Sequence, residues 1–180
     1  TPETEDSLVR AVSKRTIHAI AEMAAPSGAL ILTVASQPPL ALECPQQGAL
    51  LAEALEQSAL PELALEHAEF LRRIVRTTDA TGPVGTFWDC YFSDGVPAGN
   101  LPFAVETTAW ALWSIVRHGE HLDDKGDRVG AEAFLGAQRD LILSSADALA
   151  ACRDQATLLA CASNEEGALV PYSGLMGASS

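Results

Sequence analysis

Residues 82–121 read GPVGTFWDCYFSDGVPAGNLPFAVETTAWALWSIVRHGEH, and this stretch decides the fold because it holds all three tryptophans and the best-patterned helix. Its first part, residues 82–101, carries four glycines and the steps SDG and VPAGN, which predict a series of turns. Trp88, Asp89 and Asp94 lie within those turns, and a plain connection has no need of such aromatic surface. The second part predicts a helix over residues 104–119 whose apolar face is formed by Val105, Ala109, Leu112, Trp113 and Val116.

A long aromatic loop that leads into an apolar helix favours a pocket at the N-terminal end of that helix. The alternative is a packed loop whose aromatic side chains belong to the core. Trp110 and Trp113 are three residues apart on one helix face, so we expect them in the core.

Length and composition indicate a single domain and argue against some classes of partner. A chain of 180 residues that is 48% hydrophobic can bury the core of one domain, so we treat residues 1–180 as a single unit. The net charge of -13 argues against nucleic acid and against an anionic membrane. No segment has the apolar length of a membrane span, and residues 1–15 are too charged for a signal peptide.

The cysteines and histidines show no metal-binding spacing. None of the four cysteines forms a CxxC pair, and no histidine completes a zinc pattern with them. His118 and His121, at i and i+3, either hold a metal or, as we expect, cap the end of their helix and meet its negative dipole. We therefore predict no metal, no cofactor, reduced thiols and a cytoplasmic location. The residues concerned are Cys44, Cys90, Cys152, Cys161, His18, His67, His118 and His121.

The rest of the chain predicts further helices. A helix that Asp6 or Ser7 caps stops before Pro26 and carries the apolar residues Leu8, Val9, Val12, Ile17, Ile20 and Met23. Residues 29–35 predict a short buried extended segment, and residues 121–128 a charged surface turn. Helices are expected over residues 46–57, from Pro61 to about residue 76, and over residues 131–153. The prediction is an all-α chain of five helices in stacked α-hairpins.

Three stretches, in order, resemble the family-15 glycoside hydrolases, the glucoamylases and their bacterial relatives. They are PSGALILTVASQP (26–38), GALLAEALEQSALPELALEHAEFLRRI (48–74) and DGVPAGNLPFAVETTAWALWSIVRHGEHLDD (94–124). The resemblance implies an (α/α)6 toroid of twelve helices with its sugar pocket at the N-terminal ends of the inner helices. Because five helices cannot close such a toroid, we expect this chain to correspond to about half of it.

The sugar-binding motif of that family is altered here. Where the family has Trp-x-Arg-Asp, this chain has Cys44, Gln46 and Gln47, so neutral amides replace the charged groups that grip the terminal sugar. By resemblance, Glu106 corresponds to an acidic family position, although an acidic residue is also ordinary in a first helical turn. Trp88 beside Asp89 is the best candidate for stacking on a sugar ring. The expected sugar-binding residues are Gln46, Gln47, Trp88, Asp89, Asp94 and Glu106.

An inverting glycosidase needs two carboxylates, one as acid and one as base. The family's acid lies in a Trp-Glu-Glu segment, and the nearest match here is the pair Glu165 and Glu166 in SNEEG (163–167), which lacks the tryptophan. Glu166 is the candidate acid, and two exposed glutamates in a turn are the alternative.

Two main hypotheses about function follow. In the first, the chain belongs to a hydrolase of α-glucans whose missing half supplies the general base. In the second, it is a non-catalytic helical module that binds a glycan or a protein. Both predict self-association or a complementary chain, because an open half-toroid exposes apolar helix faces. An unrelated helical-hairpin scaffold is the third possibility.

Overall fold

The computed structural model describes residues 2–31, 41–58, 60–79, 82–98, 105–152, 161–163 and 169–171. The protein is mostly helical, as predicted, with two short two-stranded sheets within the described ranges. The elements in chain order are α1 (Pro2–Glu22), β1 (Leu42–Glu43), α2 (Pro45–Gln57), α3 (Pro61–Ile74), β2 (Tyr91–Phe92), α4 (Val105–Asp124), α5 (Arg128–Ala137), α6 (Arg139–Ala151), β3 (Cys161–Ser163) and β4 (Leu169–Pro171).

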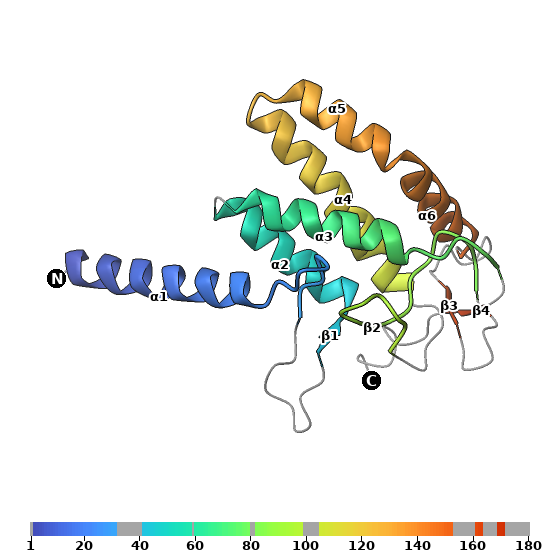
Figure 1. Cartoon of the computed structure of the whole chain (residues 1–180), viewed down its shortest axis with the longest axis horizontal. Helices are drawn as coiled ribbons and strands as arrows, with labels where there is room; N and C mark the ends of the chain where they lie inside the picture. The colour runs from blue at the N-terminus through green and yellow to red at the C-terminus, as the bar shows by residue number, and fades with distance from the viewer. Residues whose placement is uncertain are drawn as a thin grey trace.

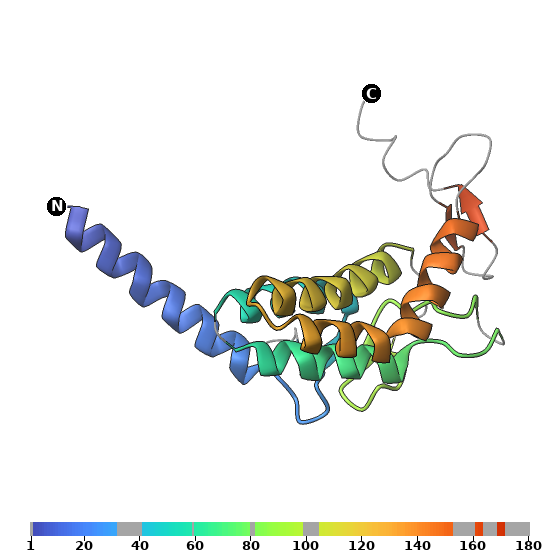
Figure 2. The same ribbon diagram turned by 90° about the horizontal axis from the view of Figure 1, so that it is seen from above.

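The helices form two consecutive α-hairpins, α2–α3 and α4–α5 (Figure 1). Helices α2 and α4 lie side by side in one layer, and α3 and α5 lie in a second layer (Figure 2). Helices α2 and α3 begin at Pro45 and Pro61, because proline has the backbone angle of a first helical turn and no N–H to satisfy. Both starts confirm the sequence prediction to within one residue.

Two buried clusters form the core. The larger joins α3, α4 and the α5–α6 junction to the loop after α3, through residues such as Phe70, Leu71, Phe87, Tyr91 and Ile115. The smaller lies between α2, the start of α3 and the end of α1, and consists of Leu30, Ala52, Leu55 and Ala64. Ala29, Leu30 and Ile31 are buried, which confirms that part of the extended segment predicted for residues 29–35; residues 32–35 lie outside the described ranges.

The buried face of α4 differs from the prediction. Trp113 is 36% exposed and Ala109 is also exposed, although both were assigned to the apolar inner face. The buried side of α4 is small and polar instead, because its hydroxyl and imidazole groups find hydrogen-bond partners on neighbouring elements and its small residues allow close approach. These buried residues are Thr107, Thr108, Ala111, Ser114, Ile115, His118 and Gly119.

Helix α1 projects from the helical body (Figures 1 and 2). It begins at Pro2, four residues before Asp6 and five before Ser7, the two predicted N-cap positions. Leu8, Val9 and Val12 are 65%, 60% and 55% exposed, so these apolar side chains of α1 lie outside the core. Only the C-terminal part of α1, around Ile20, packs against the smaller cluster.

Two predicted boundaries near the C-terminal half are also wrong. Residues 121–124, predicted as a surface turn, belong to α4, and the turn follows them. The single helix predicted over residues 131–153 is two helices, α5 and α6, which meet at Gln138. The side chain of Gln138 is fully buried and its amide donates to Glu69 Oε1 at 2.9 Å, which fixes the chain at this bend. Among the described helices, none combines the length and apolar composition that crossing a bilayer requires.

Candidate functional site

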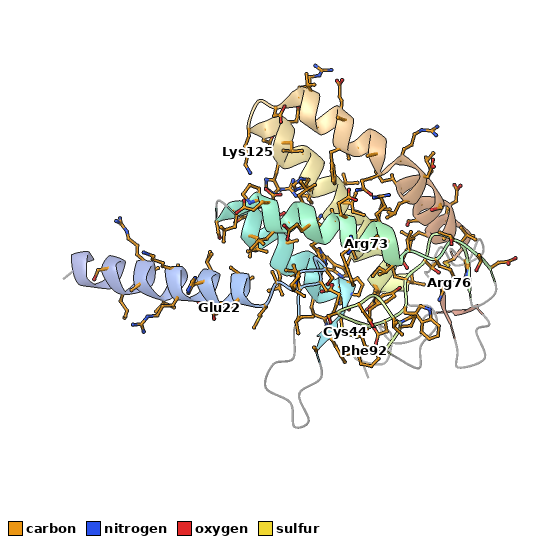
Figure 3. The ribbon with its side chains drawn as sticks, viewed as in Figure 1. Glu22, Cys44, Arg73, Arg76, Phe92 and Lys125 are labelled. Atoms are coloured by element: carbon orange, nitrogen blue, oxygen red, sulfur yellow. A yellow bond between two sulfur atoms is a disulfide. The ribbon has the colours of Figure 1, made fainter. Side chains whose placement is uncertain are left out.

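The start of α2 is joined to the aromatic loop. Strand β1 pairs antiparallel with β2, with Leu42 opposite Phe92 and Glu43 opposite Tyr91. One residue further on, Cys44 and Cys90 form a disulfide with their Cα atoms 4.2 Å apart. Cys44 and Phe92 accordingly lie close together at this end of the helical body (Figure 3). The prediction of reduced thiols is therefore wrong for Cys44 and Cys90, and the cytoplasmic location loses that support.

The aromatic loop also contacts the start of α4. The backbone N–H of Phe87 donates to Thr108 Oγ1 at 3.2 Å in a buried position. The N–H of Trp88 donates to the Tyr91 hydroxyl at 2.7 Å, which closes the loop on itself. Burial raises the pKa of Tyr91 to about 12, against smaller opposing effects of that hydrogen bond and of the Arg76 charge. Residues 87–91 of the loop are thus held in place by contacts with α4 and with each other.

The predicted sugar-binding residues fall in three places around these contacts. Half-buried Gln46 and exposed Gln47 lie in the first turn of α2, next to the disulfide. Trp88 and Asp89, both half-buried, precede Cys90, so the disulfide brings their segment to the start of α2. The Trp88 ring also lies under the Arg76 guanidinium, 5.6 Å from ring centroid to Cζ.

The other predicted residues are placed less centrally. Exposed Glu106 lies in the first turn of α4, two residues before Thr108. Asp94 is exposed, and its carboxylate accepts the N–H of Val96 at 3.0 Å, so it caps its own turn. Glu165 and Glu166 lie outside the described residues, so the predicted acid is not placed.

A buried carboxylate behind this end of α2 was missed by sequence reasoning. Glu43 and His67 are both fully buried, with Glu43 Oε1 and His67 Nε2 3.0 Å apart. Glu43 Oε2 accepts the N–H of Leu30 at 2.7 Å, so one carboxylate connects three segments. A Cβ at Gly48 would lie 2.2 Å from Glu43 Oε1, which explains the glycine in the first turn of α2. In the sequence, this glycine is the feature that could have indicated such a close contact.

A second charged cluster lies further along α2, facing α4. Glu56 hydrogen-bonds His118 Nδ1 and accepts from Lys125 Nζ at 3.1 Å. Glu53 Oε2 lies 3.1 Å from His121 Nε2, and Arg117 Nη2 lies 3.5 Å from Glu53 Oε1. The prediction that both histidines lie at the end of α4 is wrong for His118, which lies six residues before the last residue, Asp124, whereas His121 is in the last turn, as predicted. Both rings pair with carboxylates of α2. The cluster holds α2 and α4 together.

The environment of Glu53 favours its ionised form. Burial acts to raise the pKa of Glu53, but hydrogen bonds with Gln57, His121 and Arg117 together outweigh it, and the pKa is lowered. The cavity beside this cluster, lined by Trp113 and Ser114 among others, has a volume of about 10 Å³, which is room for a single water. Within the described ranges, no three His, Cys, Asp or Glu side chains are arranged to hold a metal ion.

The three tryptophans occupy different settings. Trp110 and Trp113 pack edge to face, with ring centroids 5.3 Å apart and planes at 81°. Trp113 is 36% exposed and lines the small cavity that faces α2, so the prediction of a core position is wrong for it. Trp88 lies in the segment that the disulfide joins to the start of α2, and its ring lies against the Arg76 guanidinium.

Comparisons with protein-family models, with curated proteins and with solved structures find no match to this chain.

Proposed function

We propose that this chain is a carbohydrate-recognising helical module of the glucoamylase type, with its sugar site at the N-terminal ends of α2 and α4. The observation that carries the proposal is the Cys44–Cys90 disulfide, which joins the first turn of α2 to the segment that bears Trp88 and Asp89. The resemblance implies sugar-binding residues at the start of α2, and the polar loop around Trp88 makes this residue the candidate for stacking on a sugar ring. An aromatic ring with carboxylate and amide groups beside it is a suitable surface for a sugar.

The ligand class is the non-reducing end of an α-glucan. Gln46 and Gln47 offer amide donors and acceptors to sugar hydroxyls, and Glu106 and Asp89 offer acceptors. Hydrolysis of the glucan, as an inverting reaction, would use Glu166 as the acid, with the base supplied by a complementary part of the toroid. Binding is the part of this function that the described residues can perform.

The same proposal includes a partner that completes the toroid. Trp113 and Ala109 of α4 are exposed, and Leu50 of α2 is 51% exposed, although helices of this composition normally cover such side chains. A second copy or a complementary chain would cover them. Light scattering over a range of concentrations should give at least twice the chain mass, and a strictly monomeric particle would remove this part of the proposal.

The binding function is tested by titrating the chain with maltotriose and following tryptophan fluorescence and heat. Trp88→Ala should weaken binding by roughly tenfold or more, since an aromatic stacking surface is lost. Trp113→Ala is the matched control and should leave binding unchanged. Release of glucose from soluble starch, with Glu166→Gln as the inactive variant, reports hydrolysis separately. Failure of the wild-type chain to bind or cleave any α-glucan overturns the proposal.

A further inference from the structure

Most of helix α1 lies outside the helical body. Figures 1 and 2 show it projecting from the other helices, and Figure 3 shows Glu22 at the end of α1 that meets them. Every side chain from Ser7 to Thr16 is exposed. A helix in water depends mainly on the packing of one of its faces, so a helix as exposed as this one indicates a missing partner.

One face of α1 has the residue spacing of a helix–helix contact. Leu8 and Val12 are four residues apart and are 65% and 55% exposed. Residues three and four apart lie on the same side of a helix. Continued along α1, this spacing defines a stripe of five residues, all of them exposed. The stripe consists of Leu8, Ala11, Val12, Arg15 and Ala19.

The stripe adjoins a groove at the base of α1. The groove has a volume of about 530 Å³ and lies between α1 and the connection from α2 to α3. Ala11 and Arg15 belong both to the stripe and to the groove lining, and half-buried Ile17 and Leu60 add apolar surface. A helix that lies along the stripe can therefore place apolar side chains in the groove. Lys14, His18 and Ser58 complete the lining.

The charges along α1 select the direction of a second helix. In the sequence, residues 7–21 carry three basic side chains and no carboxylate, whereas residues 3–6 include three carboxylates. A parallel second copy would bring Lys14 and Arg15 next to the same two residues, and like charges repel. An antiparallel copy brings the acidic start of one α1 towards the basic middle of the other. The same contact then forms twice, as two-fold symmetry requires.

These basic groups are not used by ion pairs within the described part of the chain. The ion pair on α1 joins His18 Nε2 to Glu22 Oε1, 3.5 Å apart, and involves neither Lys14 nor Arg15. Both of these side chains are exposed, and both line the groove. The stem of Arg15 can cover apolar surface while its guanidinium meets a carboxylate of the second copy.

We propose that two copies of this chain associate through α1, with the two helices antiparallel and each one covering the groove of the other copy. Leu8 and Val12 of one copy pack against Ala11, Ile17 and Leu60 of the second. A second copy is the partner that fits, because α1 supplies both the apolar residues and the complementary charges. An anionic membrane would repel the rest of the chain, since the net charge is -13.

This contact is separate from the one that would complete a toroid. It uses α1 and the connection between α2 and α3, whereas the toroid partner covers Leu50 on α2 and Trp113 on α4. A substitution on one surface therefore leaves the other surface intact, and the two associations can fail independently.

The test is sedimentation of the whole chain by analytical ultracentrifugation from micromolar to millimolar concentration. We expect the wild type to form a dimer that dissociates on dilution. Leu8→Asp and Val12→Asp should each weaken the dimer by roughly tenfold or more, because a charge would enter an apolar contact. Leu50→Asp is the matched control, since Leu50 is 51% exposed but lies on the other surface, and it should still form a dimer. Circular dichroism confirms that each variant is folded.

Two results of this experiment overturn the proposal. One is a wild-type chain that stays monomeric at every concentration. The other is a dimer that Leu50→Asp removes and Leu8→Asp leaves unchanged, because the association then belongs to the toroid surface.

The antiparallel direction is tested by charge. Replacing Lys14 and Arg15 together by glutamate should weaken the dimer by roughly tenfold, because the acidic start of the second helix would then meet like charge. Arg128→Glu, at an exposed position on α5, is the control and should associate as the wild type does. An unchanged dimer in the double variant overturns the antiparallel arrangement. Vesicles of phosphatidylserine should not bind the wild type; vesicle binding by a monomeric chain would assign α1 to a membrane surface and overturn the proposal.

Discussion

Helix α2 is fastened differently at its two ends. At the N-terminal end a disulfide and a two-stranded pairing connect it to residues 90–92, and the fully buried Glu43–His67 pair connects it to α3. Towards the C-terminal end, Glu53 and Glu56 face a group of basic side chains on α4, several of them partly exposed. The N-terminal end depends on a few contacts that no neighbouring group can replace. At the C-terminal end, several basic side chains pair with the same two carboxylates.

This difference indicates where single substitutions should destabilise the protein most. A fully buried carboxylate that loses its partner, or a partner that loses the carboxylate, keeps the whole cost of desolvation. Glu53 instead retains Gln57 and His121 if Arg117 is removed, and water reaches the site. Single substitutions should therefore lower the free energy of unfolding strongly at the N-terminal end of α2 and only slightly at its C-terminal end.

The largest effect is expected for Glu43→Ala. The substitution leaves the N–H of Leu30 and the Nε2 of His67 buried without their acceptor, which should lower the free energy of unfolding by roughly 3–5 kcal/mol. Urea unfolding followed by circular dichroism measures the change. Glu62→Ala, an exposed glutamate in the first turn of α3, is the control and should shift stability by less than about 0.5 kcal/mol. Equal midpoints for the two variants would show that the buried pair contributes nothing.

The second effect is expected for loss of the disulfide. Cys44 and Cys90 are 46 residues apart in sequence, so their bond restricts a long loop in the unfolded chain. Replacing both with serine should lower stability by roughly 2–4 kcal/mol. A thiol reductant should lower the wild-type midpoint to the same value and leave the double-serine variant unchanged. A reductant that has no effect on the wild type would mean that the two cysteines are not bonded.

Local signals in the sequence were enough to predict the main helices. Pro45 and Pro61 mark the starts of α2 and α3, and the alternation of short and long connections predicted helical hairpins. The resemblance directed attention to the start of α2 and to the aromatic loop, and β1, β2 and the disulfide bring these two segments together. The toroid and the role of Glu166 stay predictions.

What the sequence did not reveal depends on partners distant along the chain. Thr108 and His118 count as polar in any helical pattern, so the predicted face of α4 was the apolar one. Their hydrogen bonds with Phe87 and Glu56 compensate the cost of burying these polar groups, so this side of α4 is buried instead of the apolar one. The Cys44–Cys90 pairing likewise requires the register of β1 against β2, and the bend at Gln138 requires Glu69 on α3. Neither contact has a local signature.

The smallest effect is expected for Arg117→Gln, on α4 opposite the C-terminal half of α2. The Arg117–Glu53 pair is partly exposed, so its loss at neutral pH should lower the free energy of unfolding only slightly. The change in stability at acid pH is more informative. Because its folded pKa is lowered, Glu53 contributes stability above the pKa of an unfolded glutamate, about 4.3, and that contribution is lost as the pH falls through the folded value.

Removing Arg117 takes away one of the groups that lower the pKa of Glu53, so the variant has less of this stability to lose. Urea midpoints measured at pH 6 and pH 3 should therefore differ less for Arg117→Gln than for the wild type. Arg128→Gln, whose partner Glu132 is well exposed, should follow the wild type at both pH values. A neutral-pH loss for Arg117→Gln as large as that for Glu43→Ala would mean that the two ends of α2 are equally dependent on single contacts.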